Sequence, residues 1–158
     1  MIAILYNIRS LFNVGSIFRT ADAAGIEKLY LCGITPTPFD VFDRPRPEIA
    51  KVALGAEKTV PWEHARSTAK VIELLRRDGY KIVALEQSKK SVPYYTLRAT
   101  RHALRKVALI VGHEVKGVAP AILKRCDAVI EIPMYGKKES LNVGVAFGVV
   151  AFGLRHHR

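Results

Sequence analysis

Three segments of the chain combine glycines with polar and charged side chains, and each directly follows an apolar run. In the first, Asn13 and Gly15 lie where a helix is expected to begin, and Arg19 lies about one and a half turns further on. The free N–H groups of a helix N-terminus and the guanidinium fork of arginine both bind phosphate, so this segment predicts an anion clamp. Caps and surface arginines are common, however, and the pattern alone also fits a purely structural helix start.

The second segment, residues 111–118, leaves a predicted strand through two glycines on either side of an acid. Gly112 and Gly117 permit close approach of the backbone to a ligand, and Glu114 can accept hydrogen bonds from sugar hydroxyls or an amine. The P-loop and dinucleotide-binding glycine patterns are both absent, which argues against an ATP or NAD site. The histidines lack metal-ligand spacing, so we expect no metal site and a structural or incidental role for His113.

The third segment, residues 132–144, ends a predicted strand with a proline, continues with Gly136, Lys137 and Lys138, and leads into the last helix. We expect Ser140 to cap that helix, because serine or asparagine at such a position is more often a cap than a catalyst. None of the three segments alone defines a reaction.

The elements that must position these segments alternate between apolar strands and helices, which is typical of an α/β domain with a largely parallel sheet. Candidate strands cover Ile2–Tyr6, Lys28–Cys32, Lys81–Leu85, Val107–Val111 and Ala128–Ile132. Candidate helices cover about Val14–Ala24, Pro47–Gly55, Glu63–Asp78, Pro120–Arg125 and Leu141–Arg155, with Gly25 and Gly79 ending the first and the third. Residues 35–48 contain four prolines and are expected to form a surface loop that contacts substrate.

The composition, 158 residues of which 49% are hydrophobic and 25% charged, is that of an ordinary globular protein. It excludes overall disorder and fits one domain. Two distant cysteines, Cys32 and Cys126, fit neither a disulfide framework nor a CxxC metal site and predict free thiols in a reducing cytoplasm. The N-terminus lacks a basic leader and a cleavage site, and the longest apolar stretch is too short for a transmembrane helix.

The net charge of +11 is concentrated in the second half of the chain. Residues 1–79 carry 11 basic and 9 acidic side chains, whereas residues 80–158 carry 14 and 5. The densest basic stretch holds Lys89, Lys90, Arg98, Arg101, Arg105 and Lys106. Such a surface attracts polyphosphates, of which nucleic acid is the commonest, although a merely solubilising cationic face has the same composition.

The last predicted helix, Leu141–Arg155, is apolar around its whole circumference and therefore has to be buried on all sides. In a small domain it can be buried between the sheet and a second copy of the chain, with Gly144 and Gly148 allowing close backbone approach. We therefore expect a homodimer through this helix. The alternative is that the helix is the central core element of a monomer.

Together, the three segments resemble the three motifs of the SpoU/TrmH-type RNA ribose methyltransferases of the SPOUT superfamily. The resemblance rests on Asn13-x-Gly15-x-x-x-Arg19-x-Ala21, on Gly112-x-Glu114-x-x-Gly117, and on Ile132-Pro133-Met134 followed by Ser140-Leu141-Asn142-Val143. It implies a parallel-sheet SPOUT methyltransferase fold whose C-terminal part is threaded into a deep trefoil knot, an exception to the rule against knotted chains. Residues 1–158 would then form a single methyltransferase domain, without the appended RNA-binding domain of larger relatives.

The resemblance further implies S-adenosylmethionine as cofactor, a ribose 2′-hydroxyl of transfer or ribosomal RNA as methyl acceptor, and a dimer built partly by the last helix. Mapped onto this chain, the cofactor pocket takes Leu85, Glu86, Gly112, Gly117, Ile132, Met134, Ser140 and Leu141. The implied catalytic residues are Arg19, Asn13, Glu114, Ser140 and Asn142. RNA contacts are expected from Arg9, Arg19, Lys89, Lys90, Lys137 and Lys138.

An arginine is a poor proton acceptor, because its guanidinium group stays protonated at neutral pH. We therefore expect Arg19 to bind the phosphate next to the target ribose and to stabilise developing alkoxide charge. Two alternatives remain. The first is a non-catalytic RNA-binding dimer of the same fold, which the complete set of motif residues argues against, because binding alone would not need it. The second is an enzyme that methylates a base nitrogen, in which Asn13 and Arg19 would have no evident purpose.

Overall fold

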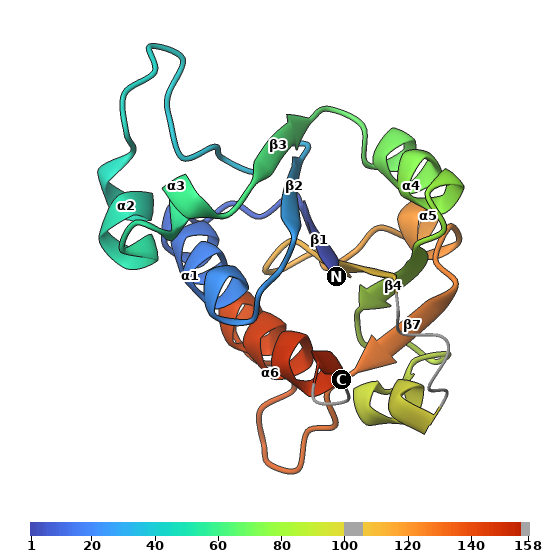
Figure 1. The fold of residues 1–158 in the computed structure, drawn as a ribbon. Coiled ribbons are helices and arrows are strands. Elements are labelled where there is room, and N and C mark those ends of the chain that lie inside the picture. The colour runs from blue at the N-terminus through green and yellow to red at the C-terminus, as the bar shows by residue number, and fades with distance from the viewer. Residues whose placement is uncertain (100–105, 156–158) are drawn as a thin grey trace.

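The computed structural model describes residues 1–99 and 106–155, which form a seven-stranded sheet flanked by helices (Figure 1). The strands are β1 (Ile2–Tyr6), β2 (Lys28–Cys32), β3 (Trp62–Ala65), β4 (Lys81–Leu85), β5 (Val92–Pro93), β6 (Val107–Val111) and β7 (Ala128–Glu131). The helices are α1 (Leu11–Ala23), α2 (Pro47–Ala53), α3 (Ala56–Thr59), α4 (Thr68–Arg77), the 3₁₀ helix η1 (Tyr94–Ala99), α5 (Pro120–Leu123) and α6 (Val143–Arg155). Within the described residues, no helix is long and apolar enough to cross a bilayer.

The strands of the described sheet pair in parallel, in the order β3-β2-β1-β6-β4-β7-β5. β6 therefore inserts between β1 and β4, both of which precede it in the sequence. The predicted α/β class with a parallel sheet is confirmed, and so are the five predicted strands, although β7 ends one residue early, at Glu131.

The sheet is covered on both faces, since alternate residues of a buried strand point in opposite directions. In β1, Ala3 and Leu5 belong to the core cluster that includes residues of α1 and α6, whereas Ile2 and Ile4 belong to the cluster that includes residues of α4 and α5. Figure 1 shows these two pairs of helices on opposite sides of the sheet. The carboxyl ends of the strands remain accessible at one edge, and the loops that follow them meet there.

Helices α1 and α6 lie side by side and run in the same direction. A Cβ atom added to Gly144 would lie 3.1 Å from Oγ of Ser16, and one added to Gly148 would lie 3.4 Å from Cγ2 of Thr20. These two glycines therefore bring α6 close to α1 of the same chain, and the expectation that they serve the approach of a second chain was wrong.

Within the single chain, helix α6 is buried on one side only, so the predicted burial of its whole circumference would require a second copy of the chain. Its buried face includes Phe147 and Val150, whereas Val145, Val149 and Phe152 are 54%, 37% and 43% exposed. These three residues are spaced by four and three positions, so they form one apolar stripe on the outer side of the helix. We call Val145, Val149 and Phe152 the α6 stripe.

Helix boundaries differ from the prediction where a neighbouring strand or a cap intervenes. β3 pairs with β2 at the edge of the sheet, so residues 62–65 are extended and α4 begins only at Thr68, after Ser67. α1 begins at Leu11 because the Ser10 hydroxyl accepts a hydrogen bond from the Asn13 N–H. α2 and α5 begin where predicted, and Gly25 and Gly79 follow the ends of α1 and α4 as predicted.

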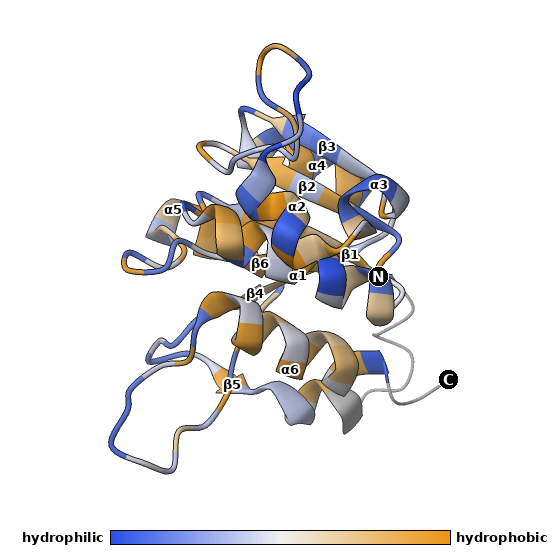
Figure 2. Ribbon diagram, turned by 90° about the vertical axis from the view of Figure 1, so that its left-hand side faces the viewer, coloured by the Kyte–Doolittle hydropathy of each residue, from blue (hydrophilic) through white to orange (hydrophobic). Residues whose placement is uncertain are grey.

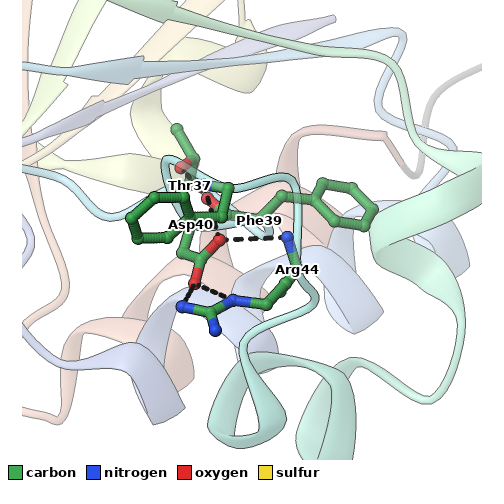
Figure 3. Close-up of polar contacts among 5 residues, drawn as sticks. Thr37, Phe39, Asp40 and Arg44 are labelled. Carbon is green, nitrogen blue, oxygen red and sulfur yellow. Dashed lines mark hydrogen bonds and ion pairs between the residues drawn. The ribbon is translucent and has the colours of Figure 1, made fainter.

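Residues 35–46 form the predicted loop after β2, whereas Pro47 and Glu48 already belong to α2; the loop is exposed at residues 41–45, and one carboxylate fixes its turn (Figure 3). Asp40 accepts hydrogen bonds from the backbone N–H groups of Phe42 and Arg44, and it pairs with the Arg44 guanidinium at 2.9 Å. The adjacent Val41 and Phe42 are 90% and 73% exposed. Contact of this loop with substrate stays a prediction.

Candidate active site

A cavity of about 340 Å³ opens at the carboxyl ends of β4, β6 and β7. This is the edge at which open α/β sheets bind their ligands. Its walls come from the segments after these three strands, residues 85–87, 111–117 and 131–143, and from the start of α6. All eight residues predicted for a cofactor pocket line the cavity: Leu85, Glu86, Gly112, Gly117, Ile132, Met134, Ser140 and Leu141.

Glu114 joins the second segment to the start of α1. Its carboxylate accepts hydrogen bonds from the backbone N–H groups of Arg9 and Ser10 at 3.0 to 3.2 Å, and from the side-chain amide of Asn13 at 3.0 Å. Partial burial alone would raise the pKa of the Glu114 carboxyl, but these hydrogen bonds outweigh it and hold the pKa below its ordinary value. A carboxylate thus occupies the position that the sequence suggested for an external anion, ahead of the first turn of α1.

Asn13 and Asn142 continue this chain of hydrogen bonds to α6. The Asn142 amide donates to Asn13 Oδ1 at 3.0 Å, and Asn142 Oδ1 accepts from the N–H groups of Gly144 at 2.9 Å and Val145 at 3.4 Å. Asn142 is therefore the cap of α6, and the expectation that Ser140 caps the helix was wrong. Ser140 is instead exposed on the cavity wall, two residues before the cap.

Glu86 and the two glycines shape the opposite wall. The Glu86 carboxylate accepts hydrogen bonds from the N–H groups of Val118 at 2.7 Å and Gln87 at 3.0 Å. A Cβ on Gly117 would lie 2.1 Å from Glu86 Oε2, and one on Gly112 would lie 2.6 Å from the carbonyl carbon of Gly117. The space beside both glycines is thus filled by the chain itself, which folds tightly enough to leave no room for a side chain.

His113 also has a structural role, which agrees with the prediction. Its Nδ1 atom accepts hydrogen bonds from the backbone N–H groups of Val115 and Lys116, at 3.0 and 3.2 Å, and so holds the turn between the two glycines. No cluster of histidines, cysteines and acids that could hold a metal ion occurs among residues 1–99 and 106–155.

Arg19 lies outside this cavity. It is exposed on α1, six residues beyond Asn13, and does not line the cavity walls. Because Ser16 and Thr20 face α6, Arg19 projects from the outer side of α1, the side on which α6 carries its exposed stripe. The structure thus brings together Asn13, Glu114, Ser140 and Asn142, and leaves Arg19 apart from them within one chain.

The predicted RNA-binding residues surround the same edge of the sheet. Arg9 follows β1, Lys89 and Lys90 follow β4, and Lys137 and Lys138 lie in the long loop between β7 and α6, all with exposed side chains. Figure 2 shows that last loop projecting away from α6 as a largely hydrophilic segment. Of the basic stretch 89–106, residues 100–105, including Arg101 and Arg105, lie outside the described residues.

Among the lining residues that the sequence analysis did not single out are Gln87, Glu131 and Glu139. Each is a direct neighbour of a residue that was singled out, and no pattern of its own marks it. Gln87 connects two walls, because its side-chain amide donates to the backbone carbonyl of Glu139 at 2.6 Å.

Comparison with known proteins places this geometry in a family. The SpoU rRNA Methylase family matches residues 1–152. The chain is 30% identical over 152 residues to the tRNA (guanosine(18)-2′-O)-methyltransferase of Aquifex aeolicus, covering 96% of this chain and 67% of that protein. It is 30% identical over 158 residues to the 23S rRNA (guanosine-2′-O-)-methyltransferase RlmB of Neisseria meningitidis, covering 100% and 59%.

The fold is similar to solved structures as well. An AdoMet-bound rRNA methyltransferase from Sinorhizobium meliloti superposes with a TM-score of 0.86 at 31% identity, covering 99% of this chain and 56% of that one. The chain therefore belongs to the SpoU rRNA methylase family, and it spans between about half and two thirds of the length of these relatives.

Proposed function

We propose that this chain transfers a methyl group from S-adenosylmethionine to a ribose 2′-hydroxyl in RNA. The observation that carries the proposal is the cavity at the carboxyl ends of β4, β6 and β7, joined to α1 and α6 by the hydrogen bonds Glu114–Asn13–Asn142. Membership of the SpoU family and the printed activities of the Aquifex and Neisseria relatives support it.

The cavity fits the cofactor in size and in chemistry. Its volume lies within the range of small-molecule sites, and apolar side chains of Leu85, Ile132, Met134 and Leu141 alternate with backbone and carboxylate groups. We propose that the apolar side chains enclose the adenine ring, with backbone groups of Ile132 and Leu141 as hydrogen-bond partners. When bound, the cofactor supplies an electrophilic methyl group on a positively charged sulfur.

The chain's own residues then orient the acceptor. We propose that Ser140 and the Asn13–Asn142 pair position the ribose at the cavity mouth, and that Glu114 keeps the start of α1 in place for this task. Because Arg19 lies apart from this cavity within one chain, we propose that in a homodimer Arg19 of one copy binds the phosphate next to the ribose at the other copy's cavity and stabilises negative charge as the hydroxyl loses its proton. The exposed basic side chains of Arg9, Lys89, Lys90, Lys137 and Lys138 hold the RNA backbone around the site.

We further propose that the enzyme is a homodimer through α6. The α6 stripe, with the 54% exposed Phe12 of α1 on the same outer side, presents apolar area that a second copy can bury. Arg19 lies next to this surface, so dimer formation would bring it near the partner chain. We also propose that the segment containing β7 and α6 passes through a loop of the chain to form a trefoil knot, as the family resemblance implies.

The two cysteines are consistent with the cytoplasmic location that we propose. Cys32 and Cys126 are free thiols, and burial raises the pKa of each to about 11. Both therefore stay protonated and unreactive at neutral pH.

The test is transfer of tritium from labelled S-adenosylmethionine into total RNA of a host that lacks the enzyme, followed by nucleoside analysis. We expect a labelled 2′-O-methylnucleoside with the wild type and none with Arg19→Ala, and the size of the labelled RNA distinguishes transfer from ribosomal substrates. Label on a base would contradict ribose methylation. RNA binding without any binding of the cofactor would favour the non-catalytic dimer.

A further inference from the structure

The cavity is lined by several acidic side chains, although most of its walls come from the half of the chain that carries most of the positive charge. Residues 80–158 contain five acidic side chains, and four of them, Glu86, Glu114, Glu131 and Glu139, line the cavity. No lysine or arginine occurs among the described lining residues, although the same half of the chain carries 14 basic side chains. The acids of this half are thus gathered at one place.

Three of these glutamates accept hydrogen bonds from neutral groups, and none of the four forms an ion pair with a described residue. Glu86 and Glu114 accept hydrogen bonds from N–H groups and an amide, and Glu131 accepts one from the Ser91 hydroxyl at 2.6 Å. The described ion pairs all involve other acids: Glu27, Glu63, Asp40, Asp127 and Glu73. Hydrogen bonds from neutral donors stabilise a carboxylate without removing its net charge, so the four lining carboxylates contribute a negative potential to the cavity.

We propose that this potential makes the pocket selective for the charged cofactor over its demethylated product, S-adenosylhomocysteine. The inference rests on the proposed function. In the transfer, the bond between methyl and sulfur breaks, its electron pair stays on sulfur, and the methyl carbon bonds to the ribose oxygen while the hydroxyl proton is released. The sulfonium becomes a neutral thioether, so a ligand with one net positive charge becomes a ligand with none.

The glutamates therefore attract the ligand before the reaction and lose that attraction after it. Several carboxylates near a unit charge change its binding constant about tenfold or more at low salt. The same field repels RNA phosphates, so the backbone of the substrate stays on the surrounding lysines and only the uncharged ribose and base approach the cavity. The loss of the positive charge therefore favours product release.

A calorimetric ligand series on the full-length wild type tests this inference. We expect S-adenosylmethionine and sinefungin, which carries an ammonium in place of the sulfonium, to bind about tenfold more tightly than S-adenosylhomocysteine at about 0.05 M salt. The ratio should shrink at about 0.5 M salt, because ions screen the field. Because sinefungin has the positive charge but lacks the sulfonium methyl group, its affinity distinguishes the effect of the charge from the effect of contacts with that methyl group.

Two variants assign the effect to the glutamates. In Glu131→Gln/Glu139→Gln we expect the ratio to fall to about threefold or less, because two of the four charges are gone. Glutamine at position 131 still accepts from Ser91, and the Glu139 side chain makes no hydrogen bond or ion pair in the described structure, so the fold should persist. Asp43→Asn is the control for loss of an acidic charge outside the cavity; it removes one exposed charge at a positive φ that asparagine also adopts.

The outcomes separate the two proposals. Equal affinities of the three ligands at low salt, or an unchanged ratio in the double variant, would overturn the charge selection while leaving cofactor binding intact. Failure of all three ligands to bind the wild type would instead count against the proposed function itself.

Discussion

At the residue scale, the site depends on polar groups that each connect two parts of the chain. Glu114 holds the start of α1, Glu86 holds the backbone at Val118, and Asn142 holds both α6 and Asn13. Single substitutions can therefore separate structural from chemical roles.

Gly117 offers the sharpest steric test. It has a φ of 62°, and a Cβ there would meet the Glu86 carboxylate. We expect Gly117→Ala to lower the free energy of unfolding by about 1 to 2 kcal/mol from the left-handed backbone alone, and to weaken cofactor binding because Glu86 must move. Thermal unfolding and calorimetry measure the two effects. Gly136→Ala is the control, since nothing lies within 4 Å of its Cβ position, and equal effects of the two variants would refute this reading.

The lowered pKa of the Glu114 carboxyl makes the stability of the folded protein depend on pH in the acidic range. Its pKa in the folded protein is lowered from 4.5, so its contribution to stability is fully present above about pH 4.5 and is lost as the pH falls through the lowered value. We expect amide signals of Arg9 and Ser10 in NMR spectra to shift in that acidic range. Glu114→Gln should abolish this transition, and its persistence in that variant would assign it to another group.

Substitution of Arg19 tests whether this residue acts in the transfer step and not in cofactor binding. Because it does not line the cavity, Arg19→Lys should leave the dissociation constant of S-adenosylmethionine unchanged while lowering turnover about 100-fold, the usual effect of losing one charge-stabilising donor. Calorimetry and single-turnover assays measure the two quantities. Near-full turnover of the lysine variant would show that the guanidinium fork has no special role.

At the element scale, the sequence allowed the five core strands to be predicted, because strands buried on both faces are continuous apolar runs. It did not allow β3 and β5 to be predicted, because these short edge strands depend on pairing with strands that are distant in the sequence. The three motifs predicted most of the residues that line the cavity. They could not reveal that Arg19 lies outside, because that depends on which side of α1 faces α6, nor that the acids of the C-terminal half converge on one cavity.

The N-terminal cap of α6 was also not predicted correctly, because serine and asparagine are both good caps and only the structure shows that Asn142 is used. Asn142→Ala should lower the free energy of unfolding by about 1 kcal/mol, measured by urea denaturation. Asn142→Asp keeps an oxygen for the Gly144 N–H and should retain most of this stability, while losing the hydrogen bond to Asn13 and with it turnover. Full activity of the aspartate variant would show that this link does not position the ribose.

At the scale of the whole molecule, one apolar surface has no partner within the described chain. Val149→Glu in the α6 stripe should shift the protein from dimer to monomer in analytical ultracentrifugation, because it places a charge in the proposed interface. Leu74→Glu on α4 is the control, since Leu74 is 46% exposed on the opposite layer of the molecule. A monomeric wild type, or dissociation by both variants alike, would contradict an interface at α6.

The hydrogen bond between Asn13 and Asn142 joins residues that are 129 positions apart. Synthesis on the ribosome proceeds from the N-terminus, so β1 and α1 emerge long before the segment that completes the cavity. Every partial chain that ends before α6 lacks one wall of the site and the cap that aligns it. A nascent or truncated chain that ends before α6 therefore lacks a complete cavity, and under the proposed function it would gain its cofactor site only once the last helix has docked.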